Sequence, residues 1–415
     1  MARIVMKFGG TSVANLERIR RVSELVEGEV KAGNEVAVVV SAMSGETNKL
    51  VGFVDDLDAD SDLGGAIDDE YDAIVASGEQ VTSGLLAIAL RRRGIKARSW
   101  LGWQIPLKTD MTHASARIEE IETLAMDPSL KSGTVGVVAG FQGISEDGRI
   151  STLGRGGSDT SAVALAVALK ADRCDIYTDV DGIYTTDPRI ADDAKRLGKI
   201  AFEEMLELAS LGAKVLQTRS VELAMNNNLP IRVLTSFAEP GQDNPGTIVC
   251  NEEETMEERV VSGIAYSRDE AQISLLRLND QPGTVAVVCR VMAEANVSVD
   301  MIVQGRSRAE NSANLTFTVG KRDLDKAVKA LEAAKADIGF EEVRSDSKVT
   351  KVSVVGIGMR SHTGVAQTMF EALAARGINV EVIATSEIKI SVLIDAEYTE
   401  LAVRALHSAF ELEKV

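Results

Sequence analysis

The sequence is poor in aromatic residues and in cations. Phe, Trp and Tyr make up 4% of the 415 residues, whereas hydrophobic residues make up 45%. The core must therefore be aliphatic, which is usual for parallel sheets whose strands are buried on both faces. Lys and Arg number 45 against 63 for Asp and Glu, so the net charge is −18. Such a surface repels nucleic acid and anionic membranes, and we expect no partner of either kind.

Cysteine and histidine are also scarce. Three cysteines without a C-x-x-C pair favour a reduced, cytoplasmic interior over a disulfide framework. The three histidines have no metal-ligand spacing, and no Ser/His/Asp or Cys/His arrangement for nucleophilic catalysis is recognisable. We therefore expect no metal site built by the protein alone, and a surface position for each of His113, His362 and His407.

The sequence also lacks the long apolar runs of membrane and secreted proteins. Its first residues enter a strand pattern directly, without the apolar segment of a signal peptide. The longest apolar stretches, such as Ser161–Leu169, fall short of the ~20 residues that span a bilayer. We expect a soluble cytoplasmic protein.

Residues 1–250 alternate short apolar runs with amphipathic segments. Leu16, Ile19, Val22 and Val26 mark one face of a helix. Repeated β-then-α order predicts one α/β domain with a parallel sheet covered on both faces, in three layers. The expected strands are Arg3–Met6, Glu35–Ser41 and Gly133–Gly140, and the expected helices include Ser161–Lys170 and Glu203–Ala213. The acidic, glycine-bearing stretch Ala59–Asp69 is predicted to be an exposed, mobile loop.

The last third of the chain contains a duplication. Gly283–Ile302 aligns with Gly364–Ile383 at a constant offset, and each copy lies among predicted strands. The order is βαββα twice, the ferredoxin-like pattern, which predicts modules at residues 262–345 and 346–415. The Pro- and Gly-bearing stretch Glu239–Asn251, with the acidic residues after it, is the predicted domain boundary.

Two glycine clusters are candidate anion sites. Lys7-Phe8-Gly9-Gly10 lies between the first strand and the first helix, where glycines allow close approach and a helix N-terminus offers free N–H groups. It is not a Walker A loop, and a plain glycine turn beside a solvated lysine is the alternative. The second cluster, Gly154–Asp159, precedes an apolar helix. Helix capping by Ser158 or Asp159 does not explain three glycines around Arg155, whose planar fork suits a carboxylate or phosphate.

A third polar segment runs from Tyr177 to Arg189. It superficially resembles an EF-hand loop, but the positions that require Gly and Glu hold Tyr184 and Ile190. A loop after a strand with one Tyr and one Arg suits a nucleotide better, and a plain solvent loop remains the alternative. Glu79 stands in the first turn of a predicted helix, where a carboxylate stabilises the helix dipole.

Together these blocks resemble the aspartokinases of the amino acid kinase family. The blocks are K-F-G-G-T-S, S-A-M-S-G-x-T-N, S-G-E, F-Q-G, T-L-G-R-G-G-S-D-T and Y-T-D-V-D-G-I-Y-T-T-D-P-R, followed by two ACT-type modules. The resemblance covers essentially the whole chain and implies a kinase for the side-chain carboxylate of aspartate. Mg²⁺ would bridge the ATP phosphates, mostly through water and ATP.

The resemblance also implies roles for individual residues. Lys7 would hold the transferring phosphoryl group with Gly9 and Gly10, and Asp159 would orient Lys7. The implied aspartate site is Ser41, Thr47, Glu79, Arg155, Gly156, Gly157 and Ser158, with Glu79 as partner of the substrate ammonium. The implied ATP site is Thr178, Asp179, Tyr184, Arg189, Lys214 and Val215.

For the ACT modules the resemblance implies regulation by an end product, threonine or lysine, bound at a dimeric interface. A homo-oligomer is therefore expected, and relatives sometimes make this region as a separate subunit, for which Met256 is a candidate start. The implied effector contacts are Asp280, Pro282, Gly283, Asn296, Asp300, Gln304, His362 and Thr363. Two alternatives stay open: a kinase of the same family for another carboxylate, and a sensor without catalytic activity.

Overall fold

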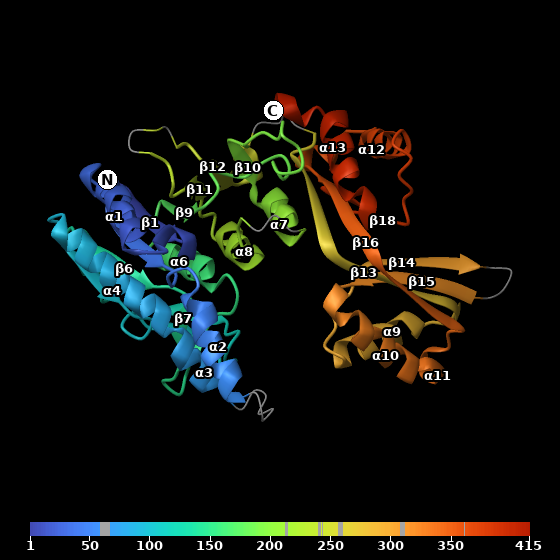
Figure 1. Cartoon of the computed structure of the whole chain (residues 1–415), viewed down its shortest axis with the longest axis horizontal. Coiled ribbons are helices and arrows are strands. Elements are labelled where there is room, and N and C mark those ends of the chain that lie inside the picture. The colour runs from blue at the N-terminus through green and yellow to red at the C-terminus, as the bar shows by residue number, and fades with distance from the viewer. Residues whose placement is uncertain are drawn as a thin grey trace. The chain divides into compact units, whose positions relative to one another are not determined.

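The chain folds into two units that interleave along the sequence. We describe a computed structural model in residues 1–58, 67–211, 215–239, 242, 244–255, 260–307, 312–360 and 362–415 (Figure 1). The first unit comprises Met1–Ile183, Arg196–Ala209 and Lys214–Thr255, and the second comprises Tyr184–Lys195, Ser210–Ala213 and Met256–Val415. The segment Tyr184–Lys195 thus packs with the carboxyl-terminal part of the chain.

An eight-stranded sheet forms the centre of the first unit. Its order is β10-β12-β11-β9-β1-β2-β6-β3, and every pair is parallel except β11 with β12. β1 and β2 are buried at every position but the first, as the β-branched runs predict. The strands are β1 (Arg3–Phe8), β2 (Glu35–Val40), β3 (Ala97–Trp100), β6 (Val135–Ala139), β9 (Arg173–Thr178), β10 (Lys199–Ala201), β11 (Ile231–Thr235) and β12 (Thr247–Cys250).

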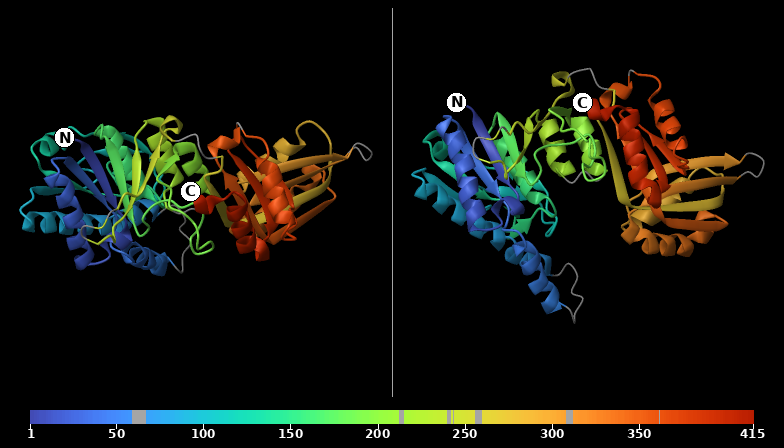
Figure 2. Two further views of the ribbon diagram at one scale, coloured as in Figure 1. Left: turned by 90° about the horizontal axis from the view of Figure 1, so that it is seen from above. Right: turned by 45° about the horizontal axis from the view of Figure 1, so that its top comes forward.

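Helices cover both faces of this sheet. α1 (Leu16–Lys31) and α4 (Ser77–Arg92) share one core cluster with Met6 and Val38, whereas α6 (Gly157–Ala168) and α8 (Thr218–Asn226) pack together on the other face. Figure 2 shows the layers from two further sides. The predicted three-layer α/β architecture is confirmed. Leu16 was expected on the buried face of its helix, but it is 53% exposed because it lies at the very start of α1.

The remaining elements of the first unit surround this core. β5 (Ile118–Ile121), β4 (Leu107–Thr109), β7 (Gln142–Ile144) and β8 (Ile150–Thr152) form a second, small sheet in that order. The helices are α2 (Glu46–Asp58), α3 (Asp68–Val75), α5 (Asp127–Lys131) and α7 (Phe202–Ser210), with short 3-10 turns η1 (Gly10–Val13) and η3 (Glu252–Glu254). Of the predicted loop Ala59–Asp69, residues 59–66 lie outside the described part, and Asp68 and Asp69 open α3.

One helical stretch, Asp68–Arg92, has the length and hydropathy of a membrane span. Core helices of soluble proteins pass the same test. Leu86 and Leu90 of this stretch are fully buried in the core beneath the sheet, which favours the core explanation.

The second unit is built on one antiparallel sheet of six strands, ordered β14-β15-β13-β16-β18-β17. Its elements follow the predicted βαββα order twice, and the two ferredoxin-like modules are confirmed. The first module has β13 (Gly263–Asn279), α9 (Thr284–Glu294), β14 (Asp300–Ser307), β15 (Ser312–Val319), α10 (Leu324–Ala333) and the short α11 (Lys335–Ile338). The second has β16 (Glu342–Val355), α12 (Val365–Ala374), β17 (Val382–Thr385), β18 (Lys389–Asp395) and α13 (Thr399–Ala409).

The two modules share their central strands. The second half of β13 packs in the core of the first module, but Ile264 in its first half belongs to the core of the second. β16 runs without a break across the predicted boundary at residues 345 and 346. It pairs with β13 along its length and with β18 from Val349 onward. The predicted boundary segment Glu239–Asn251 also contains strand β12, so the first unit continues to Thr255.

Candidate active site

Three of the predicted site residues, Lys7, Ser41 and Thr178, lie at the ends of neighbouring parallel strands. Lys7 lies near the end of β1, Ser41 follows β2, Gly140 follows β6, and Thr178 ends β9. These four strands are adjacent in the order β9-β1-β2-β6. The carboxyl edge of an open α/β sheet is the usual place for ligand binding in such folds.

Lys7 and Asp159 form a buried ion pair at this edge. The distance from Lys7 Nζ to Asp159 Oδ1 is 2.5 Å, and the two residues are 9% and 7% exposed. Asp159 lies in the first turn of α6, whose N-cap is Gly156 at φ +74°, so neither Ser158 nor Asp159 is the cap. An ammonium held in this way keeps its charge in a fixed position where it can meet a phosphate.

The glycines after β1 allow two loops to approach closely. A Cβ added to Gly10 would lie 3.1 Å from the carbonyl oxygen of Ala42, and one added to Gly9 would lie 3.5 Å from Lys7 Nζ. The helix expected directly after these glycines is only the 3-10 turn η1. α1 begins at Leu16, where the side chain of Asn15 accepts a hydrogen bond from the N–H of Arg18.

Glu79 is a buried carboxylate with one oxygen unused. It is 3% exposed, and its Oε1 accepts a hydrogen bond of 3.0 Å from the N–H of Ala42. Its Oε2 is buried and has no hydrogen-bond partner in the described part of the chain. Burial raises the pKa of Glu79 to about 7, although backbone hydrogen bonds act in the opposite direction. A cationic ligand that reaches the free oxygen would stabilise the ionised form of this buried carboxylate.

The other predicted substrate residues border the same edge. Arg155 is exposed, and no ion pair to it is found among the described residues. Gly157 and Ser158 are buried, and a Cβ on Gly140 would lie 3.1 Å from the Cβ of Ser158. Thr47 lies in the first turn of α2, in the loop-to-helix segment that follows Ser41.

The predicted ATP residues divide between the units. Thr178 donates a 3.0 Å hydrogen bond to Asp179 in the first unit. Tyr184 and Arg189 belong to the second unit, where Arg189 is paired with Asp187 at 2.7 Å and its side chain is 86% exposed. Lys214 lies outside the described residues, and Val215 is half-buried. The role of these residues in ATP binding stays a prediction.

The predicted effector contacts fall into separate groups within the chain. Gly283 and Gly364 are the N-caps of α9 and α12, at φ +99° and +101°, so the two turns have the same geometry. The exposed residues Pro282, His362 and Thr363 precede them. Asp280 in the first turn pairs with Arg306 of β14, and Gln304 is exposed on that strand.

Asn296 and Asp300 lie at the other end of α9, beyond its last residue. Asp300 pairs at 2.7 Å with Lys351, a buried lysine that also contacts Glu270 at 2.7 Å. The ion pair with Lys351 was not predicted, and it gives Asp300 a partner inside the module.

Asp72 of α3 is a buried residue that the sequence did not single out. It is fully buried and accepts hydrogen bonds from Thr152 Oγ1, from the N–H of Ala114, and at 2.9 Å from the ring of His113 if that nitrogen carries the proton. Thr152 lies two residues before Gly154, so Asp72 anchors the base of the Gly154–Asp159 loop. No local signal marks it, because it stands among other acidic residues.

The expectation that all three histidines are on the surface was wrong. His362 is exposed, but the side chain of His113 is only 12% exposed and that of His407 is 1% exposed. His407 lies on the inner face of α13, and its Nε2 is 2.9 Å from Thr185 Oγ1. Single histidines carry no periodic signal, so their burial depends on packing.

Comparisons with known proteins agree with this architecture. The profile of the amino acid kinase family matches residues 2–235, and ACT domain profiles match residues 272–336 and 352–410. An aspartate kinase of Pseudomonas fluorescens is 53% identical over 414 residues, covering 100% of this chain and 98% of that protein. An aspartokinase of Pseudomonas aeruginosa is 52% identical over 415 residues, with the same coverage.

Solved structures give the same answer. A crystal structure of E. coli aspartokinase III in complex with aspartate and ADP has a TM-score of 0.79 and 29% identity, covering 98% of this chain and 99% of that chain. The same enzyme in complex with lysine and aspartate has a TM-score of 0.76. The family profile covers residues 2–235, and the two relatives are 53% and 52% identical along the full length. This chain therefore belongs to the aspartokinases of the amino acid kinase family, which are ATP-dependent kinases with two ACT domains.

Proposed function

We propose that the chain transfers the γ-phosphoryl group of ATP to the β-carboxylate of L-aspartate, giving 4-phospho-L-aspartate and ADP. This is the first step toward lysine, threonine and methionine. The observation that carries the proposal is the buried pair of Lys7 and Asp159, 2.5 Å apart beside Gly9 and Gly10. The fold shared with an aspartokinase crystallised with aspartate and ADP supports the same pair of substrates.

The reaction requires positioning and charge more than acid–base chemistry. The nucleophile is the substrate carboxylate, which is already ionised near neutral pH, so no general base is needed. One of its oxygens forms a bond to the γ-phosphorus while the bond from that phosphorus to the bridging oxygen breaks, and ADP leaves with the electron pair. Lys7 neutralises charge that develops on the phosphoryl oxygens, and Asp159 fixes the position of Lys7.

Aspartate is held at both ends in this proposal. The free Oε2 of Glu79 receives the substrate ammonium, which supplies the cation that this buried carboxylate lacks among the described residues. Arg155, exposed and without an ion pair in the described part of the chain, receives the α-carboxylate. Ser41 follows β2, Thr47 lies in the first turn of α2 and Ser158 in the first turn of α6, and we assign all three to the same site.

We also propose Mg²⁺ as the metal that accompanies ATP. Mg²⁺ takes oxygen ligands and keeps several waters, and the residues fit because Asp159 offers a carboxylate at the phosphate end of the site. When bound with ATP, the metal neutralises phosphate charge. Asp159 holds Lys7 in the same place.

Replacing Lys7 tests the proposed mechanism. Lys7→Met should lower kcat for aspartate about 10²–10³-fold, because one preorganised charge is lost from the transition state. Binding of ATP should weaken much less. The measurement is a coupled ADP-release assay with aspartate and Mg²⁺-ATP, together with nucleotide titration. Lys31→Met, at the exposed end of α1, is the control. An unchanged kcat for Lys7→Met would remove Lys7 from the mechanism.

A substrate screen tests the choice of acceptor. Glutamate, acetylglutamate, carbamate and uridylate are acceptors of other amino acid kinases, and the same ADP assay compares each with aspartate. We expect turnover with aspartate alone. Faster turnover with another acceptor would transfer the proposal to that substrate.

We further propose inhibition by threonine, lysine or both through the ACT modules. Support comes from the lysine complex of the E. coli relative and from the two matching glycine turns before α9 and α12. Inhibition would arise if the effector favoured an inactive arrangement. Asp300→Ala is expected to relieve it, measured as kinase rate against effector concentration.

The ion pair of Asp300 requires a control for this test. Lys351→Met breaks the same pair while leaving the carboxylate of Asp300 in place, and it is compared under conditions where circular dichroism shows both variants folded. If Asp300 contacts the effector, Asp300→Ala raises the inhibitory concentration more than Lys351→Met does. Equal effects would mean that Asp300 acts only through Lys351. Rates that ignore millimolar threonine and lysine would end the regulatory proposal.

Association through the ACT modules is the last part of the proposal. The outer strands β14 and β17 carry Ile302 and Ile383 at equivalent positions, 49% and 46% exposed. Exposed apolar residues on the edge strands of a sheet favour pairing with another chain. We propose a homo-oligomer, to which a separately translated ACT-only subunit could add. Its candidate start, Met256, lies outside the described residues.

A further inference from the structure

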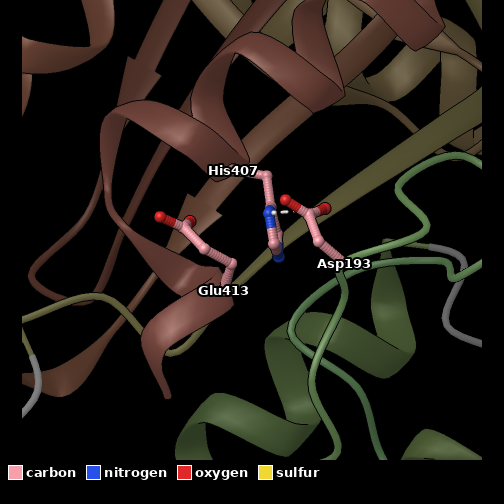
Figure 3. Close-up of side chains that lie close together, drawn as sticks. All are labelled: Asp193, His407 and Glu413. Carbon is pink, nitrogen blue, oxygen red and sulfur yellow. Dashed lines mark ion pairs between the residues drawn. The ribbon is translucent and has the colours of Figure 1, made fainter.

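Three potential metal ligands, none of them assigned above to catalysis, meet in the second unit. They are His407 of α13, Glu413 of the 3-10 turn η7 (Leu412–Lys414), and Asp193 of the segment Tyr184–Lys195. One ligand atom from each lies within 4.8 Å of the other two. Figure 3 shows Asp193 and Glu413 on either side of the imidazole ring.

The imidazole of His407 is held from behind. Its Nε2 lies 2.9 Å from Thr185 Oγ1, and that hydroxyl also accepts a 3.0 Å hydrogen bond from the N–H of Lys195. When Nε2 donates its proton to Thr185, the lone pair of Nδ1 points toward Asp193 and Glu413. Metal-bound histidines are oriented in the same way, by a hydrogen bond from the nitrogen that does not bind the metal.

The Nδ1 side of the ring faces Asp193 but makes no hydrogen bond within the described part of the chain. His407 is 1% exposed, and its Nδ1 makes no hydrogen bond to any described residue. Oδ1 of Asp193 is 3.4 Å from this nitrogen. Oε2 of Glu413 is also buried without a hydrogen-bond partner in the described part of the chain. Buried polar atoms are rarely left unpaired, so two such atoms in one place point to a missing ligand.

The charge of the cluster indicates that this ligand is a cation. The neutral imidazole is the form that binds metals, and the two other potential ligands in the cluster are carboxylates. Asp193 and Glu413 then contribute two negative charges. The nearby ammonium of Lys414 pairs instead with Glu411, at 2.7 Å.

We propose that Asp193, His407 and Glu413 bind one divalent transition-metal ion of the zinc type. One imidazole nitrogen and two carboxylates suit Zn²⁺, Co²⁺ or Ni²⁺ better than Mg²⁺ or Ca²⁺, which prefer oxygen alone. Three protein ligands leave a fourth position for water. The ion joins the segment Tyr184–Lys195 to α13 and η7.

The segment joined in this way is already attached to the second unit at other points. The N–H of Ile264 donates a 2.7 Å hydrogen bond to the carbonyl oxygen of Thr185, and the hydroxyl of Tyr266 donates to Asp187 at 3.1 Å. Ile190 packs in the core of the second ACT module. The metal would add one further link between this segment and the second ACT module, and we assign it no part in the proposed reaction.

The test is metal binding by the full-length chain without nucleotide. Protein stripped with a chelator is titrated with Co²⁺ and Zn²⁺ in excess Mg²⁺, which excludes the ATP-associated metal. We expect one equivalent per chain, a visible Co²⁺ absorption band, and slower amide hydrogen exchange across residues 184–195. Loss of one ligand should weaken binding at least about tenfold, since even second-shell changes cost 10–100-fold.

Asp193→Asn and Glu413→Gln are the deciding variants, because both substitutions preserve the size of the side chain. The side chain of Asp193 is 54% exposed, and Glu413 is only partly buried. His407→Gln is made as well, with circular dichroism to verify folding, since His407 is buried. Glu411→Gln, two residues from Glu413 and paired only with Lys414 in the described structure, is the matched control and should bind like the parent. Absence of binding in the parent overturns the proposal. So does an unchanged affinity in both Asp193→Asn and Glu413→Gln.

Discussion

At the scale of single residues, burial gives the site its chemistry. Glu79 would be an ordinary surface carboxylate at most helix starts, but here Gly78 brings α4 against the loop after β2. A Cβ at Gly78 would lie 2.8 Å from that of Ala42. This close approach removes water from Glu79 and raises its pKa to about 7. Lys7 is buried too, but Asp159 supplies its counter-charge within the protein.

The raised pKa of Glu79 predicts a pH dependence of aspartate capture. A carboxylate is needed to receive the substrate ammonium, so kcat/KM for aspartate should rise about tenfold between pH 6 and 8. Glu79→Gln should lower kcat/KM and flatten this rise, which initial rates at subsaturating aspartate measure. A rise that persists unchanged in Glu79→Gln would assign the titration to another group.

The raised pKa of Glu79 also affects stability: a higher pH favours aspartate capture but lowers the free energy of unfolding. The folded pKa lies above the ordinary value of 4.5, so the folded state binds a proton more tightly than the unfolded chain does. Glu79 therefore lowers the free energy of unfolding as pH rises from 4.5 to about 7. Glu79→Gln removes this loss, and denaturant unfolding at both pH values measures it.

At the scale of elements, the ACT modules are joined by strands that serve both. Lys351 of β16 contacts Glu270 of β13 and Asp300 of β14, and its side chain is 7% exposed. This three-residue cluster lies where the pairing of β13 with β16 shifts register, between Ser267 and Glu270. The ion pairs of Lys351 thus connect the strands at the point where the regular backbone pairing of β13 with β16 is interrupted.

Removing the cation from this cluster should destabilise the second unit. Lys351→Met leaves the buried Glu270 without its partner, which costs about 3–5 kcal/mol in comparable cases. Lys348→Met, on the exposed part of the same strand, should change the free energy of unfolding by less than about 0.5 kcal/mol. Adding Glu270→Gln to Lys351→Met should restore part of the loss. Equal stability of the two lysine variants would contradict the cluster's role.

At the scale of the whole molecule, chain order and structural units differ. The amino acid kinase profile covers residues 2–235, yet Tyr184–Lys195 within it packs in the second unit. This segment contains Tyr184 and Arg189, which the family resemblance assigns to ATP. Under the proposed function, the segment that carries Tyr184 and Arg189 is held by the same unit that contains the ACT modules.

Removing the ACT modules should therefore expose this segment. A chain that ends at Thr255 lacks the partners of Thr185 and Ile190, so residues 184–195 should be cleaved faster by protease than in the full-length chain. Limited proteolysis with mass spectrometry measures the cleavage site, and the full-length chain is the control. Equal protection in both chains would show that the second unit does not hold the segment.

The sequence by itself determined the motifs, the order of elements and the duplication. Glycine turns, buried β-branched runs and helical spacing are local, so they predicted β1, β2, α6 and both βαββα modules. The tertiary structure decided what depends on neighbours distant in the chain. Burial of Glu79 and Asp72, the contact of Asp300 with Lys351, and the interior position of His407 all arise from packing between such segments. Sequence periodicity does not show whether a single polar residue is buried, because burial depends on contacts that form only in the folded chain.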